Sequence, residues 1–126
     1  MRLAPIVPFM VGVIMLLPGG RALGLSALGL RAAIHNCQNS GIAPESRIAA
    51  CSEVIHTNLG SHDFLARFYY NRGAAYEAAN DIDHASQDYD KALELKPDFA
   101  EAQANSARLK ERHSAGSSAV APQDSK

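Results

Sequence analysis

The sequence predicts an all-α protein made of antiparallel helical hairpins. Apolar residues recur at helical spacing in successive segments. Short breaks rich in Asn, Gly and Pro separate these segments, and one of the breaks is only two residues long. The 126 residues, of which 47% are hydrophobic and 20% charged, are enough for one small domain.

The first 24 residues have the pattern of a secretory signal. Arg2 gives a basic start, residues 3–17 are uncharged and mostly apolar, and Ala22 and Gly24 place small residues before a cleavage point. We therefore expect residues 1–24 to be a cleaved signal peptide, with no stable membrane span left after cleavage. The mature protein would then be periplasmic or secreted. A retained membrane anchor is the alternative.

Residues 25–60 predict a first helical hairpin. Its helices are expected over residues 27–38 and 45–56, because an Asn-Ser-Gly turn follows the first and Pro44 suits the start of the second. The apolar stripe of the first helix is predicted to contain Leu28, Ala32, Ile34 and Cys37. The matching face of the second is predicted to contain Ile48, Cys51, Val54 and Ile55.

The two cysteines predict a structural disulfide. Cys37 lies seven residues before Pro44 and Cys51 seven after it, so the two face each other in an antiparallel hairpin. A cysteine pair in a small exported protein is typical of a disulfide. A metal site that adds His35 and His56, or a redox pair, is the competing interpretation. The spacing is unlike that of either, and no cofactor or metal is expected.

A second pair of helices is predicted over residues 64–79 and 82–95, joined by a tight Asn-Asp turn. Gly73 lies inside the first of these helices, where glycine costs up to about 1 kcal/mol relative to alanine. This cost predicts a close approach of the neighbouring helix, and Ala85 is the small residue placed to meet Gly73.

Residues 66–99 resemble one 34-residue unit of the tetratricopeptide repeat family. The residues that carry the resemblance, and that it assigns to packing within the repeat, are Tyr69, Gly73, Tyr76, Ala85, Tyr89, Ala92 and Pro97. Arg72 replaces the leucine usual in the family, and we expect its stem to cover the core edge while its guanidinium reaches water. The resemblance implies an α-solenoid of about two and a half repeats.

The repeat continues into one more helix. Asp98 and Glu101 predict a capping box that opens a helix ending near His113, so that residues 61–113 hold the repeat and a capping helix. Residues 114–126 have the composition of a disordered tail, in which no partner helix is expected. The last helix therefore either caps the array or docks on a second copy to make a homodimer.

Composition and spacing exclude several function classes. A formal net charge of −1 does not suit a nucleic-acid binder driven by phosphate neutralisation. The stretch from Asp81 to Ala92 lacks the glycine and glutamate of a calcium loop, and we expect Asp88 and Asp90 on the wet face of their helix. Since no catalytic combination of residues stands out either, the chain is not expected to be an enzyme.

The resemblance implies a concave groove that holds a peptide or a partner protein. Carried over by position, the groove residues are Arg67, Tyr70, Asn71, Ala74, Glu77, Ala78, Asn105 and Arg108. The acidic stretch between residues 77 and 101 equally suits a basic partner. The alternative is a structural subunit of a larger envelope assembly.

Overall fold

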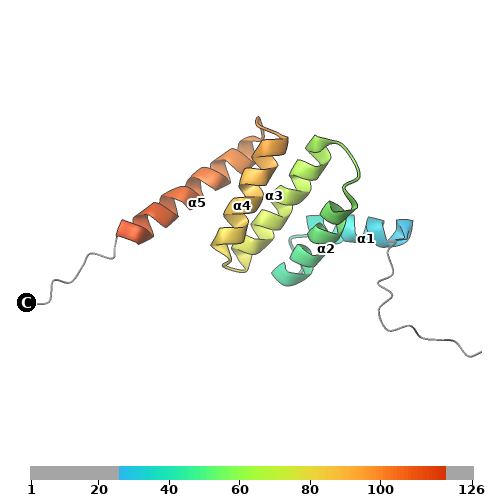
Figure 1. Cartoon of the computed structure of the whole chain (residues 1–126). Coiled ribbons are helices and arrows are strands. Elements are labelled where there is room, and N and C mark those ends of the chain that lie inside the picture. The colour runs from blue at the N-terminus through green and yellow to red at the C-terminus, as the bar shows by residue number, and fades with distance from the viewer. Residues whose placement is uncertain (1–25, 119–126) are drawn as a thin grey trace, which may run out of the picture.

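The computed structural model describes residues 26–118, which form five α-helices and no strand. Figure 1 shows the helices in chain order: α1 (Ala27–Gln38), α2 (Pro44–Thr57), α3 (His62–Ala78), α4 (Ile82–Leu95) and α5 (Ala100–Ser118). The predicted signal peptide, residues 1–24, lies outside the described residues. No helix within residues 26–118 is long and apolar enough to cross a membrane.

Polar side chains begin three of the helices. A side-chain oxygen of each capping residue accepts a hydrogen bond from a free backbone N–H of the first turn, which stabilises the helix start. The caps are Ser26 on α1, Ser61 on α3 and Asp81 on α4. The bounds of α1 and α4 are those that the sequence predicts. Because Ser61 is the cap, α3 begins two residues before the predicted Phe64.

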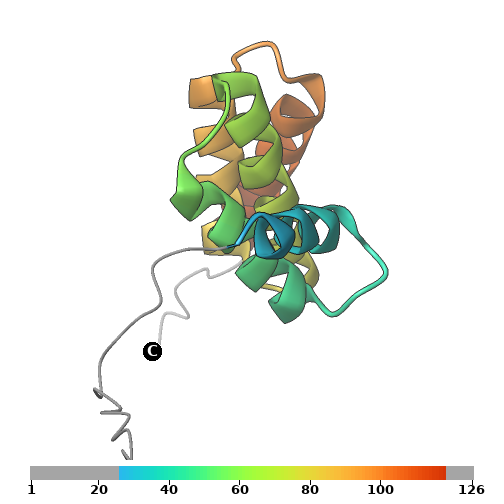
Figure 2. The same cartoon turned by 90° about the vertical axis from the view of Figure 1, so that its right-hand side faces the viewer.

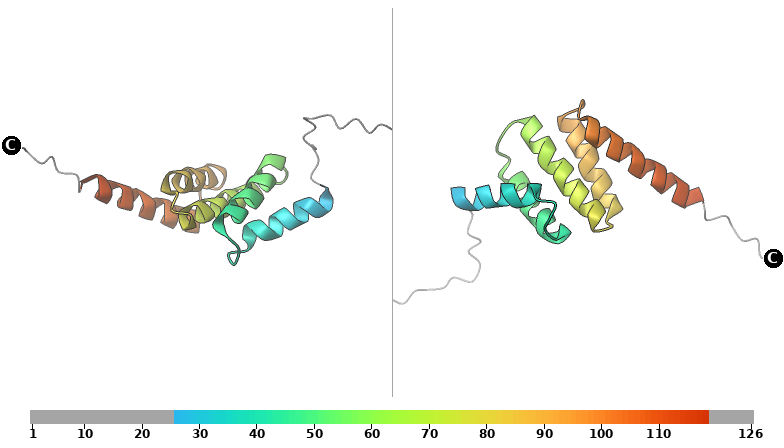
Figure 3. Two further views of the ribbon diagram at one scale, coloured as in Figure 1. Left: turned by 90° about the horizontal axis from the view of Figure 1, so that it is seen from below. Right: turned by 180° about the vertical axis from the view of Figure 1, so that it is seen from behind.

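Helices α2 to α5 lie side by side in chain order, and α1 crosses α2 at a steep angle at one end of the row (Figures 1 and 2). Seen from behind, in Figure 3, α1 lies over α2. It also contacts α3. The C-terminal half of α5 diverges from α4 and projects beyond it (Figure 1).

Helix α1 buries a different face from the one predicted. Leu30 and Ile34 pack against a core cluster that contains Ala33 and Cys37, whereas Leu28 is 78% exposed. Ala32 is exposed as well. The predicted stripe was therefore wrong for Leu28 and Ala32, because the buried positions follow the i, i+3, i+4, i+7 spacing from Leu30 and these two residues lie on the opposite face.

The disulfide ties α1 to this cluster. Cys37 and Cys51 are joined, their Cα atoms are 4.7 Å apart, and both side chains are fully buried. A Cα separation of this size is within the range that a disulfide spans. The bond connects the last turn of α1 to the middle of α2, as the turn at Pro44 predicts.

Gly73 allows α3 and α4 to nest. A Cβ atom added at Gly73 would lie 3.0 Å from two ring carbons of Tyr89 and 3.2 Å from the backbone oxygen of Ala85. Ala85, Tyr89 and Ala92 are all fully buried. The close approach that the sequence predicts is therefore present, and the ring of Tyr89 fills the space left by the missing side chain.

The Arg72 guanidinium is held by partners within the chain and does not extend into water as the sequence predicts, although the side chain is still 18% exposed. Its Nε and Nη2 atoms donate to the two carboxylate oxygens of Asp88, each at 2.8 Å, and Nη1 donates to Ser52 at 3.0 Å. The guanidinium also lies 5.4 Å from the Tyr69 ring centre and 5.9 Å from that of Tyr76. Since α3 lies between α2 and α4, the side chain ends between these helices.

Asp88 differs from prediction and Asp90 does not. Asp88 is 5% exposed and belongs to the ion pair, so it does not lie on a wet face. The Asp90 side chain is 46% exposed, as the prediction requires. It accepts hydrogen bonds from Ser106 at 2.8 Å and from Lys110 at 3.0 Å.

Both ends of α5 depart from prediction. The helix begins at Ala100, so Asp98 lies before the cap position and forms no capping box with Glu101. The contact found at this helix start is a hydrogen bond from the Gln103 side chain to the Pro97 backbone oxygen, at 2.6 Å. The helix then continues to Ser118, so the first five residues of the predicted disordered tail, 114–118, are helical. No proline lies between Pro97 and Pro122, and adding residues to an existing helix costs far less than starting one.

Candidate binding surface on α3 and α5

The eight predicted groove residues divide into two groups. Four of them are held by hydrogen bonds within the chain: Tyr70, Glu77, Asn105 and Arg108. The other four form an open row along α3: Arg67, Asn71, Ala74 and Ala78.

The first group is a polar network that joins α3, α4 and α5. The Arg108 guanidinium donates to both oxygens of Glu77, at 2.6 and 2.9 Å, and the Tyr89 hydroxyl donates to the same carboxylate at 3.1 Å. Farther along, the Asn105 amide donates to the Tyr70 hydroxyl at 3.4 Å. The network therefore fixes α5 against the first helix of the repeat.

Ionisation in the network follows from these contacts. The hydrogen bond from Arg108 is the main reason that the pKa of Glu77 lies below its ordinary value. The pKa of Tyr89 is raised, first because the ring is buried and second because the Glu77 carboxylate is negative. Glu77 is thus charged at neutral pH and its charge is compensated inside the molecule.

Sequence reasoning missed the network although it named four of its members. Each bond joins residues 31 to 35 positions apart on different helices, except for the bond from Tyr89, which crosses from α4 to α3. The available signal was the 34-residue period, which places Asn105 at the same repeat position as Asn71. This period shows that helices α3 and α5 occupy equivalent positions in successive repeats, but it does not show which of their side chains form hydrogen bonds.

The open row lies at i, i+4, i+7 and i+11, which is one face of a helix. Arg67 and Ala78 are exposed, and Asn71 and Ala74 are half-buried. At one end of the row, Arg67 borders a shallow hollow of about 280 Å³ with Ser61 and Phe64. The row offers one cation, one amide and two small side chains to a partner.

The acidic stretch is partly neutralised within the chain. Of its eight carboxylates, four pair with Lys or Arg: Glu77 with Arg108, Asp88 with Arg72, Asp90 with Lys110, and Glu94 with Lys91. Asp81 contacts His84, which compensates its charge only when the imidazole is protonated. The pairing lowers the net negative charge that the stretch offers to a basic partner.

Metal binding finds no support in the described part of the chain. Residues 26–118 contain no group of three or more histidine, cysteine or acidic side chains placed to hold a metal ion. The sulfurs of Cys37 and Cys51 are bonded to each other and so are not available to join His35 and His56 as ligands.

Comparison with known proteins gives one match. The family model of the tetratricopeptide repeat matches residues 66–99. No curated protein and no solved structure matches the chain significantly. The matched segment covers most of α3, all of α4 and the turn before α5. Repeats of this family are generally protein–protein interaction domains rather than enzymes. The helical pair with its nested glycine and the family model agree, and residues 66–99 are therefore a tetratricopeptide repeat.

Proposed function

We propose that this protein is an exported, non-catalytic interaction module that holds a peptide or a partner protein against the open row of α3. The observation that carries the proposal is the row itself. Arg67, Asn71, Ala74 and Ala78 share one helix face, none of them is fully buried, and none of their side chains makes a hydrogen bond within residues 26–118.

The chemistry of the row suits an extended chain. The Asn71 amide can donate and accept hydrogen bonds at once, as a peptide backbone requires. Ala74 and Ala78 are small enough to let a backbone approach the helix, and Arg67 adds a positive charge. The polar network beside the row supports this arrangement, since it holds α5 and α3 in fixed positions before any partner arrives.

Export is supported by the buried disulfide. Disulfides persist in oxidising compartments and are rare in the cytosol. Residues 1–24 have the composition of a secretory signal. Mass spectrometry of the purified protein tests both features, because cleavage after Gly24 and a mass two daltons below that of the reduced chain are expected. A protein recovered with its first 24 residues and two free thiols would contradict export.

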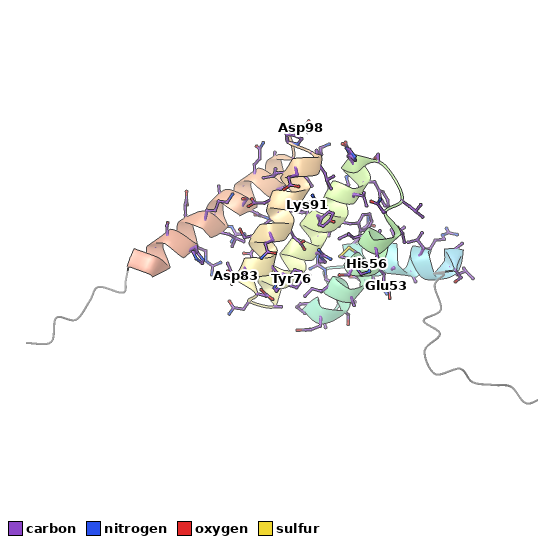
Figure 4. All side chains as sticks on the ribbon, in the orientation of Figure 1. Glu53, His56, Tyr76, Asp83, Lys91 and Asp98 are labelled. Atoms are coloured by element: carbon purple, nitrogen blue, oxygen red, sulfur yellow. A yellow bond between two sulfur atoms is a disulfide. The ribbon has the colours of Figure 1, made fainter. Side chains whose placement is uncertain are left out.

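The binding surface is tested by site-specific photocrosslinking. A photoreactive amino acid at position 71 should give a discrete adduct in cells, whereas the same group at the exposed position of Glu53 on α2 should not (Figure 4). Once a partner is identified, Arg67→Ala with Asn71→Ala should weaken its binding at least about tenfold without lowering the melting temperature. Identical adducts at both positions, or unchanged binding, would refute the proposed surface.

A further inference from the structure

A second surface, separate from the open row, lies between α4 and α5 and extends almost to the end of α5. The two helices run in opposite directions and diverge (Figure 1), and a groove of about 620 Å³ lies between them. Ile82 and Leu109 contribute apolar side chains to this groove. A smaller hollow of about 400 Å³ shares Ile82 and His113 with it and reaches Gly116. The groove is therefore continuous from Leu109 to a point close to Ser118, where α5 ends.

Gly116 lies inside α5 with open space beside it. A Cβ atom added there would meet no atom within 4 Å, whereas one added at Gly73 would meet Tyr89 and Ala85 of α4. Glycine in a helix costs up to about 1 kcal/mol relative to alanine, and at Gly73 the packing of α4 offsets this cost. Gly116 leaves room for another segment to approach α5 as closely as α4 approaches α3.

The last turns of α5 lack cover within residues 26–118. Every residue from 110 to 116 is exposed. Because a helix in a protein gains most of its stability from packing, an additional segment in the groove would stabilise this end of α5.

Residues 119–126, which follow α5 directly, are long enough to be that segment. The return from Ser118 to Leu109 covers about 14 Å along the helix. Residues 119–126 span about 26 Å when extended. The difference leaves enough chain for a turn after Ser118.

The order of side chains in this segment, AVAPQDSK, matches the groove. Its first four residues are apolar and would reach Ile82 and Gly116 first. Its last four are polar, and the groove farther from the end of α5 is lined by Ser86 and Gln87. The residue before a proline favours an extended backbone, so Ala121 suits a segment that lies along a groove.

We propose that residues 119–126 fold back over the end of α5 and occupy the α4–α5 groove of the same chain, with Val120 against Ile82 and beside Gly116. The short connection from α5 gives the segment an effective concentration of about 1 mM or more, so a weak contact is sufficient to hold it. In this position the segment covers the apolar floor of the groove and closes it to other ligands.

Paramagnetic relaxation in NMR spectra of the purified protein tests the proposal. A nitroxide attached through Ser125→Cys should at least about halve the amide signals of Ser86 and Gln87, because it lies near them when the groove is occupied. Signals from α1, at the other end of the molecule, should be unchanged (Figure 1). Val120→Asp should abolish the effect, since its carboxylate would be buried against Ile82 without a partner. Ala121→Asp is the matched control and should preserve the effect, because neighbouring side chains of an extended segment point to opposite sides.

Gly116→Arg separates occupation of the groove from folding. The open space beside residue 116 accommodates the new side chain, and arginine favours a helix more than glycine does, so the melting temperature should not fall while the label effect is lost. Unchanged signals of Ser86 and Gln87 in the labelled protein, or a loss of signal that survives Val120→Asp, would overturn the proposal.

A mixed sample distinguishes the same chain from a second copy. Spin-labelled protein without isotopes is added to unaltered, isotope-labelled protein, whose signals should stay intact. A loss of signal in that mixture would show that the groove holds the segment of another molecule, contrary to the proposal. Arg67→Ala with Asn71→Ala should not change the label effect, so this test succeeds or fails independently of the open row.

Discussion

The ion pair between Arg72 and Asp88 should dominate the stability of the repeat. Arg72→Leu restores the residue usual in the family but leaves the Asp88 carboxylate, 5% exposed, without its cation. Breaking a buried pair by removing one partner costs about 3–5 kcal/mol. Since the Arg72 side chain is itself 18% exposed, we expect a loss near the lower limit, about 3 kcal/mol.

Substitution of Asp88, the partner of Arg72, should lower the free energy of unfolding by less. Asp88→Ala leaves a guanidinium that still donates to Ser52 and lies near two tyrosine rings, so we expect a loss of about 2 kcal/mol. The double variant buries two apolar side chains and no charge. It should lie within about 2 kcal/mol of the unaltered protein, because replacing a whole buried pair is often close to neutral.

The assay is a double-mutant cycle in urea, followed by circular dichroism with the disulfide intact. The expected coupling energy is at least about 3 kcal/mol, and the exposed pair of Lys91 and Glu94 serves as the control with less than about 0.5 kcal/mol. Additive effects at 72 and 88, or a stability gain from Arg72→Leu alone, would show that the carboxylate is well solvated and that the argument from burial is wrong.

Three further outcomes are expected. Replacing Cys37 and Cys51 by serine opens a loop of about 15 residues and should cost about 3 kcal/mol, seen as a lower melting temperature than that of the oxidised protein; equal melting temperatures would contradict this. Gly73→Leu must displace the buried Tyr89 ring, so it should lower the free energy of unfolding measured in urea by at least about 2 kcal/mol. An unchanged free energy of unfolding would disprove the close packing of α3 on α4. Because its arginine partner lowers the pKa of Glu77, the stability from this pair is complete above about pH 4.5 and is lost as pH falls through the lowered value. Glu77→Gln should therefore flatten the stability profile between about pH 5 and pH 3, and an unchanged acid slope would count against the pair.

Local patterns in the sequence were sufficient for the helices and for the nested pair. The bounds of α1 and α4 follow from capping residues and apolar periodicity, which act within a few residues of the chain. Gly73 was informative for a related reason, since the cost of a glycine inside a helix is offset where a neighbouring helix comes close. The disulfide was predictable because Cys37 and Cys51 are each seven residues from Pro44, where the chain turns.

Tertiary structure alone decided the destination of the charged side chains. For α1, by contrast, the sequence held the signal, because Leu28 faces solvent opposite a buried face whose members, Leu30, Ile34 and Cys37, recur at helical spacing. Arg72 and Asp88 pair because α3 lies between α2 and α4, and Glu77 meets Arg108 because α5 packs over the repeat. Helical periodicity in the sequence shows which residues share a face. Whether a charge on that face meets water or another charge depends on which helix covers it, and only the packed molecule determines that.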